Sequence, residues 1–430
     1  MSSTNTSGTS GEKLLCSNPL CEAVLVNKAI RCPRCKEAQS YCPSCGASVR
    51  VLSRFCRACG TTLRNNWSVE HPGLRARPTR NLDVDAKSVF RLDWELSIDS
   101  EMIAAPLAAR GVIILTLNSG HIVILDEVDG NVRRELATTP PLSFTPIISD
   151  NLLVVATGEG IIAFDLIAAI YGNVARGGLK VWHHRFAIDE QVIQPLLATG
   201  DIVMAVVKNT QQTQLLILDK KTGQQRHNVL LDSRANKTTT PYLKGKDLFI
   251  GIKSGTIIAI DITQAKIVAS SPPGRGVDTN IIPTSLGNNL LYVLADSKIW
   301  TSQTTDLTRG KITLQPFGDI GGLLINSLAS SDKYLAIAHG FGVALYDAFG
   351  KQIWETQLDG NSIASPPLIV GDWAWVIDDS GVMFFFHLTS SVPKMRQRIF
   401  EYSMSLPAIL TADRLVFSNR IGQIKVFRWK

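Results

Sequence analysis

A repeat of about 43 residues fills the chain from about residue 88 onward, and it restricts the possible folds more than any other feature. Each unit carries a proline, then a short polar or glycine turn, then an apolar run. One unit has lost its proline, and Ser327 stands near the vacant place. The series of prolines is Pro106, Pro146, Pro195, Pro241, Pro283, Pro366 and Pro407.

The apolar runs within each unit predict β-strands. VIILTL, LLVVAT and DLFIGI are examples, each followed by a turn and a second run such as GHIVILD or GTIIAID. Side chains alternate with period two, and helical patterns are almost absent. Four antiparallel strands in a unit of this length are typical of a propeller blade. The sequence therefore predicts a mainly β fold, an eight-bladed β-propeller whose units start near Met102, Leu142, Val192, Thr238, Val277, Gly322, Ile363 and Met404.

The last unit is short. SMSLPAILTADRLVFSNRIGQIKVFRWK has room for three strands only, and the segment 88–99, which precedes the first complete unit, supplies a fourth. Trp94 in this segment matches Trp354, because each tryptophan is followed by Glu. We therefore expect Arg91–Ile98 to pair with Ile424–Trp429, which would remove the exposed edges of an open sheet.

The "LD..tG" turns and the Trp-Glu strand starts resemble the quinoprotein-like (PQQ-like) propeller repeat over residues 88–430. WD-type repeats are the alternative, but their Gly-His and Trp-Asp signatures are missing. The resemblance implies a possible quinone-dependent enzyme, with the quinone and Ca²⁺ over a central channel, an Asp base and often a vicinal disulfide. Residues 88–430 contain no cysteine. We therefore expect no enzyme and no catalytic or cofactor-binding residue in this domain.

The remaining polar and aromatic candidates are expected to be structural. We expect His183 and His184 to point to opposite faces of a strand and His339 to lie in a turn. One of Trp373 and Trp375, together with Phe385, should pack between blades or form an exposed patch for interactions. Aspartates at the ends of strands should cap hairpin turns through side chain to backbone hydrogen bonds; they are Asp126, Asp219, Asp261 and Asp347. Three segments are predicted as loops of a binding surface: 168–180, 208–214 and 271–280.

All eight cysteines lie in a short N-terminal stretch. Crowding into closely spaced pairs favours metal ligation in a reducing compartment over disulfides. Each C-x2-C aims two thiolates at one point, and two such pairs supply the four sulfurs of a closed structural zinc site. The expected ligands of two Zn²⁺ ions are Cys16, Cys21, Cys32, Cys35, Cys42, Cys45, Cys56 and Cys59.

This stretch resembles a double zinc ribbon over residues 13–64, with 1–12 as a disordered N-terminus. The first ribbon departs from the usual spacing, because four residues separate Cys16 from Cys21. Sequential pairing already makes two matched units, and a cross-braced pairing is the alternative. So small a module cannot bury enough apolar surface to fold without metal, which makes the zinc structural.

Basic residues are concentrated in the N-terminal part. Residues 1–80 carry 12 Lys/Arg against 4 Asp/Glu, and the rest of the chain is close to neutral. Residues 65–87 are predicted to be a basic linker, with Arg75, Arg77 and Arg80. Nucleic-acid or ribonucleoprotein binding through the ribbon and this linker is therefore an alternative function, although eight thiolates and two Zn²⁺ would offset part of the positive charge.

The leading hypothesis is a non-enzymatic, cytoplasmic scaffold that binds protein partners of unknown identity. The apolar stretch 152–170 is interrupted by Glu159 and Asp165, so no membrane insertion is expected. The quinone-dependent enzyme implied by the repeat remains a further alternative.

Overall fold

The structure is a computed structural model of the chain. It describes residues 21, 23–25, 32–35, 39–41, 48–50, 90–142, 144–172, 179–232, 238–252, 255–272, 284–286, 289–293, 299–303, 310–317, 325–331, 333–358, 362–363, 366–401, 406–411 and 414–428.

The chain divides into two units, Met1–Ser68 and Val69–Lys430. In the first unit, β1 (Gln39–Tyr41) and β2 (Ser48–Arg50) form a two-stranded antiparallel sheet with Tyr41 opposite Ser48. The predicted domain boundaries near residues 12, 64 and 87 fall outside the described residues, as does the predicted linker.

The second unit is mainly β, and its described strands form eight antiparallel sheets. We number these sheets along the chain. Sheet 1 contains β4 (Leu107–Ala109), β5 (Val112–Thr116), β6 (His121–Asp126) and β7 (Val132–Ala137). Sheet 2 contains β8 (Ile147–Ser149), β9 (Leu152–Thr157), β10 (Gly160–Asp165) and β11 (Lys180–Arg185). Sheet 3 contains β12 (Gln191–Val192), β13 (Leu197–Thr199), β14 (Ile202–Lys208), β15 (Thr213–Asp219) and β16 (Gln225–Asp232).

Sheets 4 to 8 follow the same order. Sheet 4 contains β17 (Tyr242–Lys244), β18 (Asp247–Gly251), β19 (Ile257–Asp261) and β20 (Lys266–Ser270). Sheet 5 contains β21 (Thr284–Leu286), β22 (Asn289–Val293), β23 (Ile299–Gln303) and β24 (Gln315–Pro316). Sheet 6 contains β25 (Ile325–Ser330), β26 (Tyr334–His339), β27 (Gly342–Asp347) and β28 (Gln352–Gln357). Sheet 7 contains β29 (Leu368–Val370), β30 (Trp373–Ile377), β31 (Val382–His387) and β32 (Met395–Arg398). Sheet 8 contains β33 (Ile409–Leu410), β34 (Arg414–Ser418), β35 (Gln423–Arg428) and β3 (Arg91–Ser97).

The two middle strands of a sheet are buried on both faces. In sheet 1 every residue of β5 is buried, and so is every residue of β6 after His121, whereas the outer strand β7 is largely exposed. A strand covered on both faces reads as a continuous apolar run, so the predicted alternation with period two is wrong for VIILTL.

Buried clusters join consecutive sheets. One cluster contains Ile114 and Ile124 of sheet 1 with Val155 and Ile162 of sheet 2. Similar clusters join sheets 2 and 3, 3 and 4, 5 and 6, 6 and 7, and 7 and 8. Another cluster joins sheet 8 to sheet 1, so the last sheet packs against the first.

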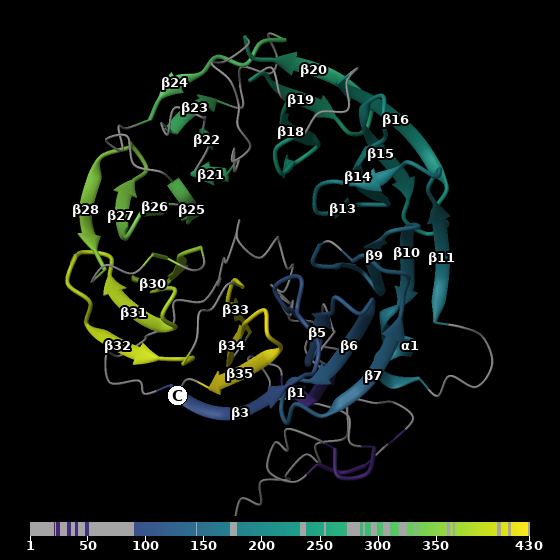
Figure 1. Cartoon of the computed structure of the whole chain (residues 1–430), viewed down its shortest axis with the longest axis vertical. Helices are drawn as coiled ribbons and strands as arrows, with labels where there is room; N and C mark the ends of the chain where they lie inside the picture. Colours follow the sequence, from purple (N-terminus) through teal and green to yellow (C-terminus); the bar gives the residue numbers. More distant parts are fainter. Residues whose placement is uncertain are drawn as a thin grey trace, which may run out of the picture. The chain divides into compact units, whose positions relative to one another are not determined.

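Sheet 8 unites the two ends of the second unit. β3 pairs antiparallel with β35, with Arg91 opposite Arg428 and Ser97 opposite Gln423 (Figure 1). These are the segments that the repeat predicts to be partners. β3 is the fourth strand of this sheet and covers an edge that β35 would otherwise expose.

One of the predicted loops differs in the structure. The segment predicted to start at residue 168 lies partly in a helix, α1 (Leu166–Tyr171), because Asp165 caps its first turn by accepting a hydrogen bond from the backbone N–H of Ala168 at 2.9 Å. The segment 208–214 contains a four-residue turn, 209–212, between the last residue of β14, Lys208, and the first residue of β15, Thr213. Of the third segment, residues 273–280 lie outside the described part.

Candidate functional site

Three of the predicted zinc ligands lie together in the first unit. The sulfurs of Cys21, Cys32 and Cys35 are all within 4.8 Å of one another. Cys21 and Cys32 are buried, whereas Cys35 is exposed. All three are thiols rather than halves of a disulfide bond. Leu25 packs with the two buried cysteines, and Arg34 Nη1 donates to the carbonyl oxygen of Cys21 at 3.0 Å, which ties the C-x2-C turn to the first knuckle.

The spacing of these sulfurs fits a tetrahedral zinc site. Cys21 Sγ and Cys32 Sγ are 3.6 Å apart. Four sulfurs at about 2.3 Å from a zinc ion stand about 3.8 Å apart, so this separation matches one edge of the tetrahedron. It is far too long for a disulfide bond, whose sulfurs are about 2.05 Å apart. Three thiols at this spacing could therefore hold a metal ion.

The other predicted ligands lie outside the described residues: Cys16, Cys42, Cys45, Cys56 and Cys59. Cys42 and Cys45 fall in the sequence between the paired strands β1 and β2. Arg75, Arg77 and Arg80 of the predicted basic linker also lie outside the described part.

The turn aspartates of the second unit cap their hairpins, as the sequence predicts. Asp126 Oδ1 accepts from the backbone N–H of Val128 at 2.8 Å, and Asp347 Oδ1 accepts from those of Phe349 and Lys351 at 2.9 Å. Asp219 and Asp261 make equivalent bonds. These carboxylates stabilise tight turns between the last two strands of each sheet.

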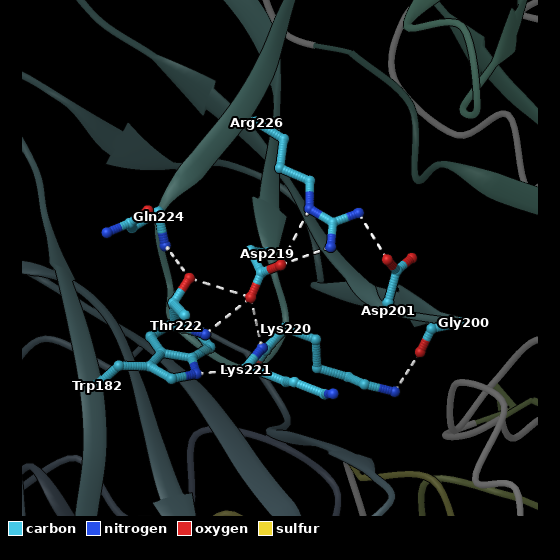
Figure 2. Close-up of polar contacts among 9 residues, drawn as sticks. All are labelled: Trp182, Gly200, Asp201, Asp219, Lys220, Lys221, Thr222, Gln224 and Arg226. Carbon is cyan, nitrogen blue, oxygen red and sulfur yellow. Dashed lines mark hydrogen bonds and ion pairs between the residues drawn. The ribbon is translucent and has the colours of Figure 1, made fainter.

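A guanidinium group strengthens the turn of sheet 3. Figure 2 shows Arg226 between Asp219 and Asp201, with Nε donating to Asp219 Oδ2 at 3.1 Å and Nη1 contacting Asp201 Oδ2 at 2.7 Å. The side-chain bond from Arg226, followed by the turn amide of Thr222, holds the pKa of the Asp219 carboxyl well below its usual range. The hydrogen bonds of Arg226 to Asp219 and Asp201 raise the pKa of the guanidinium group.

Sheet 4 uses a lysine for the same purpose. Lys246 Nζ lies 2.6 Å from Asp261 Oδ2. This bond is the main cause that lowers the pKa of Asp261, and it raises the pKa of Lys246 in return.

The turns of sheets 1, 3 and 7 also receive a tryptophan side chain from a neighbouring sheet. Trp182 of β11 donates from Nε1 to the carbonyl oxygen of Lys220 at 2.8 Å (Figure 2). Gly223 lies against the indole, and a Cβ atom there would be 2.5 Å from the ring. Trp94 bonds the carbonyl oxygen of Glu127 at 3.0 Å in the same manner, and Trp354 bonds that of Leu388 at 2.9 Å. The repeated tryptophans therefore lock neighbouring sheets together.

In sheet 1 an arginine stands in the tryptophan position. The register between third and fourth strands shifts next to Arg134, as it does next to Trp182 and Trp354. Arg134 Nη2 donates to the carbonyl oxygen of Gly172 at 2.8 Å, at the end of α1. The helix replaces the tight turn of sheet 2, and a cation at its C-terminus suits the helix dipole better than an indole would. Sequence reasoning missed these register shifts, because a bulge leaves no signal in the apolar pattern.

The three histidines considered in the sequence all lie in strands. His183 and His184 are neighbours on β11, and burial together with the cations of Lys180 and Arg185 lowers the pKa of His183. The prediction of a turn for His339 is wrong: it is the last residue of β26, and its side chain is 2% exposed. Its Nε2 lies 3.3 Å from Glu355 Oε1, yet burial outweighs this carboxylate and lowers the pKa of His339.

The aromatic cluster of sheet 7 is core. Trp375 and Phe385 are buried, and their rings pack with that of Phe90, which precedes β3 of sheet 8. These side chains fill the space between two sheets, which is the first of the two predicted roles.

No protein-family model matches the chain, and no curated protein matches its sequence. Solved structures are similar in fold. Ika8, a computationally designed protein, has a TM-score of 0.59 at 14% identity and covers 77% of this chain and 97% of its own. A europium-containing methanol dehydrogenase has a TM-score of 0.62 at 12% identity and covers 84% of this chain and 98% of its own. A quinohemoprotein alcohol dehydrogenase from Pseudomonas putida HK5 also has a TM-score of 0.62, at 9% identity, covering 80% of this chain and 77% of its own.

At these identities the likeness shows the fold alone, a mainly β, propeller-like arrangement. The resemblance to quinoprotein propellers seen in the repeat is supported at this level, and no zinc-ribbon family is matched. Among the described residues, no helix is long and apolar enough to span a membrane.

Proposed function

We propose that this protein is a non-enzymatic scaffold that binds protein partners through an eight-bladed β-propeller and a zinc-ribbon module. The eight sheets would be the blades, and sheet 8 would close the ring through β3. Support comes from the order of packing, in which six buried clusters among the described residues join sheets that are consecutive in the chain and one joins sheet 8 to sheet 1.

The observation that carries the non-enzymatic part is the use of the turn carboxylates. Asp126, Asp219 and Asp261 each accept backbone N–H bonds and pair with a cation, and Asp347 accepts two such bonds. A carboxylate held in this way stabilises a turn, and one whose pKa is lowered by such bonds is a poor general base. The lowered pKa values of Asp219 and Asp261 agree with this role.

Zinc would stabilise the first unit. The cluster of Cys21, Cys32 and Cys35 supports one site, completed by Cys16, and the remaining four cysteines would form the second. Four thiolates leave no open position for a substrate, so each zinc would be structural. Thiols at this spacing favour a reducing compartment, and we place the protein in the cytoplasm as part of this proposal.

The test has a metal part and a partner part. Elemental analysis of the intact chain should give two zinc ions, and a Cys32→Ser variant should give one. Affinity purification of the intact chain from its native host should co-elute a specific protein that the Cys32→Ser variant or a propeller-face variant loses. Absence of zinc would overturn the metal site, and saturable binding of a quinone cofactor with Ca²⁺, followed by substrate oxidation, would overturn the scaffold.

A further inference from the structure

One end of sheets 6 and 7 combines exposed apolar side chains with lysines. Phe349 is 92% exposed, Val392 is 64% exposed and Ile353 is 40% exposed. Three exposed lysines stand in or beside the same turns. We call this group the 6–7 turn surface; it consists of Lys333, Phe349, Lys351, Ile353, Val392 and Lys394.

The topology brings these residues to one end. In a four-stranded antiparallel sheet, the first and third turns lie at the same end. Lys333 precedes Tyr334, which pairs with Asp347 at the start of the turn that holds Phe349. Val392 and Lys394 lie in the equivalent connection of sheet 7. Trp354 joins the two sheets at this end by donating to the carbonyl oxygen of Leu388 at 2.9 Å.

The turn holds Phe349 in a fixed backbone conformation. Asp347 Oδ1 accepts from the N–H groups of Phe349 and Lys351, and Gly350 adopts φ of +81°. A Cβ on Gly350 would be 2.9 Å from the carbonyl oxygen of Phe317, so the turn sits closely against the preceding sheet. An exposed aromatic ring on a rigid turn loses little conformational entropy on binding, which suits an anchor residue.

Over the part of the chain that the structure describes, the 6–7 turn surface lacks the ion pairs that the turns of sheets 1, 3 and 4 make with their turn aspartates. In sheets 1 and 3 the residue at the register shift is a cation, Arg133 or Arg226, that pairs with the turn aspartate. In sheets 2, 4 and 6 the same position holds an apolar residue, which is Val181, Val268 or Ile353. The first turn of sheet 4 pairs Lys246 with Asp261, whereas Lys333, at the matching position, has no ion pair among the described residues.

The other two lysines of this surface, Lys351 and Lys394, also make no ion pair within the described part of the chain, and basic residues continue along β32. Arg396 and Arg398 follow Lys394 at alternate, exposed positions. Two carboxylates, Asp347 and Asp372, lie in the described parts of these turns. The local charge is therefore positive, although the second unit as a whole is close to neutral.

We propose that the 6–7 turn surface docks an acidic segment of a protein partner. Bulky apolar side chains of that segment pack on Phe349, Ile353 and Val392, and its carboxylates pair with Lys333, Lys351 and Lys394. This inference rests on the scaffold function and names the partner chemistry that one of its surfaces selects.

The test uses the intact chain and a displayed library of random 16-residue peptides. Selection at low salt should enrich peptides rich in Asp, Glu and large apolar residues. Phe349→Ala should weaken binding of the enriched peptides by about tenfold or more, since buried aromatic anchors dominate such interfaces. A Lys351→Glu/Lys394→Glu variant should weaken peptide binding by a similar factor and remove most of the salt dependence of the dissociation constant.

Two matched variants serve as controls. Ile188 is fully exposed and follows β11 in sheet 2, and Lys221 is an exposed lysine in the turn of sheet 3. Ile188→Ala and Lys221→Glu should change binding by less than about twofold, because substitutions outside an interface are energetically neutral. Thermal unfolding of every variant should match that of the parent, since all substituted side chains are exposed.

Several outcomes would overturn the inference. Enriched peptides that bind Phe349→Ala as tightly as the parent, or that are basic, would remove this surface as their site. A dimer that dissociates on Phe349→Ala substitution would assign the surface to a second copy of this chain. If only Ile188→Ala abolished peptide binding, the binding site would be assigned to the surface around Ile188, and the proposed scaffold function would remain. Failure to enrich any peptide, together with no specific partner in the affinity purification, would overturn both proposals.

Discussion

Arg414 Nε donates to Asp93 Oδ2 at 3.0 Å, which joins two residues 321 positions apart in the chain. Arg428 donates to the same oxygen at 3.0 Å. Asp93 is the residue that the register skips where β3 pairs with β35, so its carboxylate lies beside both arginines. These contacts stabilise the sheet that unites the two ends of the second unit.

Replacing Asp93 by Ala should lower the free energy of unfolding by about 2 kcal/mol. The Arg414 side chain is 5% exposed, and the loss of its nearer carboxylate is costly, although Glu127 Oε1 remains 3.9 Å from Nη1. Urea unfolding measures the change. Glu95→Ala is the matched control on the same strand, because Glu95 and Lys425 form a more exposed pair at 3.4 Å whose loss should cost less than about 0.5 kcal/mol. Equal effects of the two substitutions would contradict the role of Asp93.

Gly223→Ala should destabilise the protein by about 3 kcal/mol. The new Cβ would meet the ring of Trp182, and φ at Gly223 is +70°. Gly245→Ala is the control, because φ there is +62° while no atom lies within 4 Å of the place that an alanine methyl group would take. That variant should lose about 1 kcal/mol from backbone strain alone. Chemical denaturation measures both losses of unfolding free energy. Equal losses in the two variants would show that the contact between Gly223 and Trp182 does not contribute to the effect.

Acid should destabilise the second unit partly through Asp219 and Asp261. Both carboxyls have a pKa that folding lowers, so the folded state binds fewer protons than the unfolded state near pH 4. Their contribution is complete above the unfolded pKa of about 3.9 and is lost as the pH falls further. Asp219→Asn should reduce stability at pH 7 and flatten the fall in stability below pH 4. Asp99→Asn, at an exposed position, should leave the profile unchanged.

His339 should add a second pH dependence at higher pH. Burial lowers its pKa below the ordinary value of about 6.5, so the unfolded state binds the proton more readily. Stability from this group is complete above about pH 6.5 and falls as the pH drops below that value. His339→Gln should remove this fall, measured as the midpoint of thermal unfolding at pH 7 and pH 5. His227→Gln, at an exposed position on β16, should keep it; loss of the fall in that variant would assign the effect elsewhere.

Much of the second unit could be predicted from local patterns. Apolar runs such as VIILTL predict strands because the middle strands are buried on both faces, and the spacing of prolines predicts the units. The turn aspartates were also predictable, since Asp219 bonds amides only two and three residues away. In the first unit, sequential pairing predicted that Cys21, Cys32 and Cys35 belong to one site, and the structure places these three sulfurs close together.

The sequence by itself determined the local chemistry of this protein: the strands, the capped turns and the crowding of cysteines, because each depends on residues near one another in the chain. Only the tertiary structure decided that Gly223 lies under Trp182, that Arg134 ends α1 and that Asp93 meets Arg414. Those relationships arise between separate sheets or distant strands, whose approach depends on register shifts and packing that no short stretch of sequence encodes.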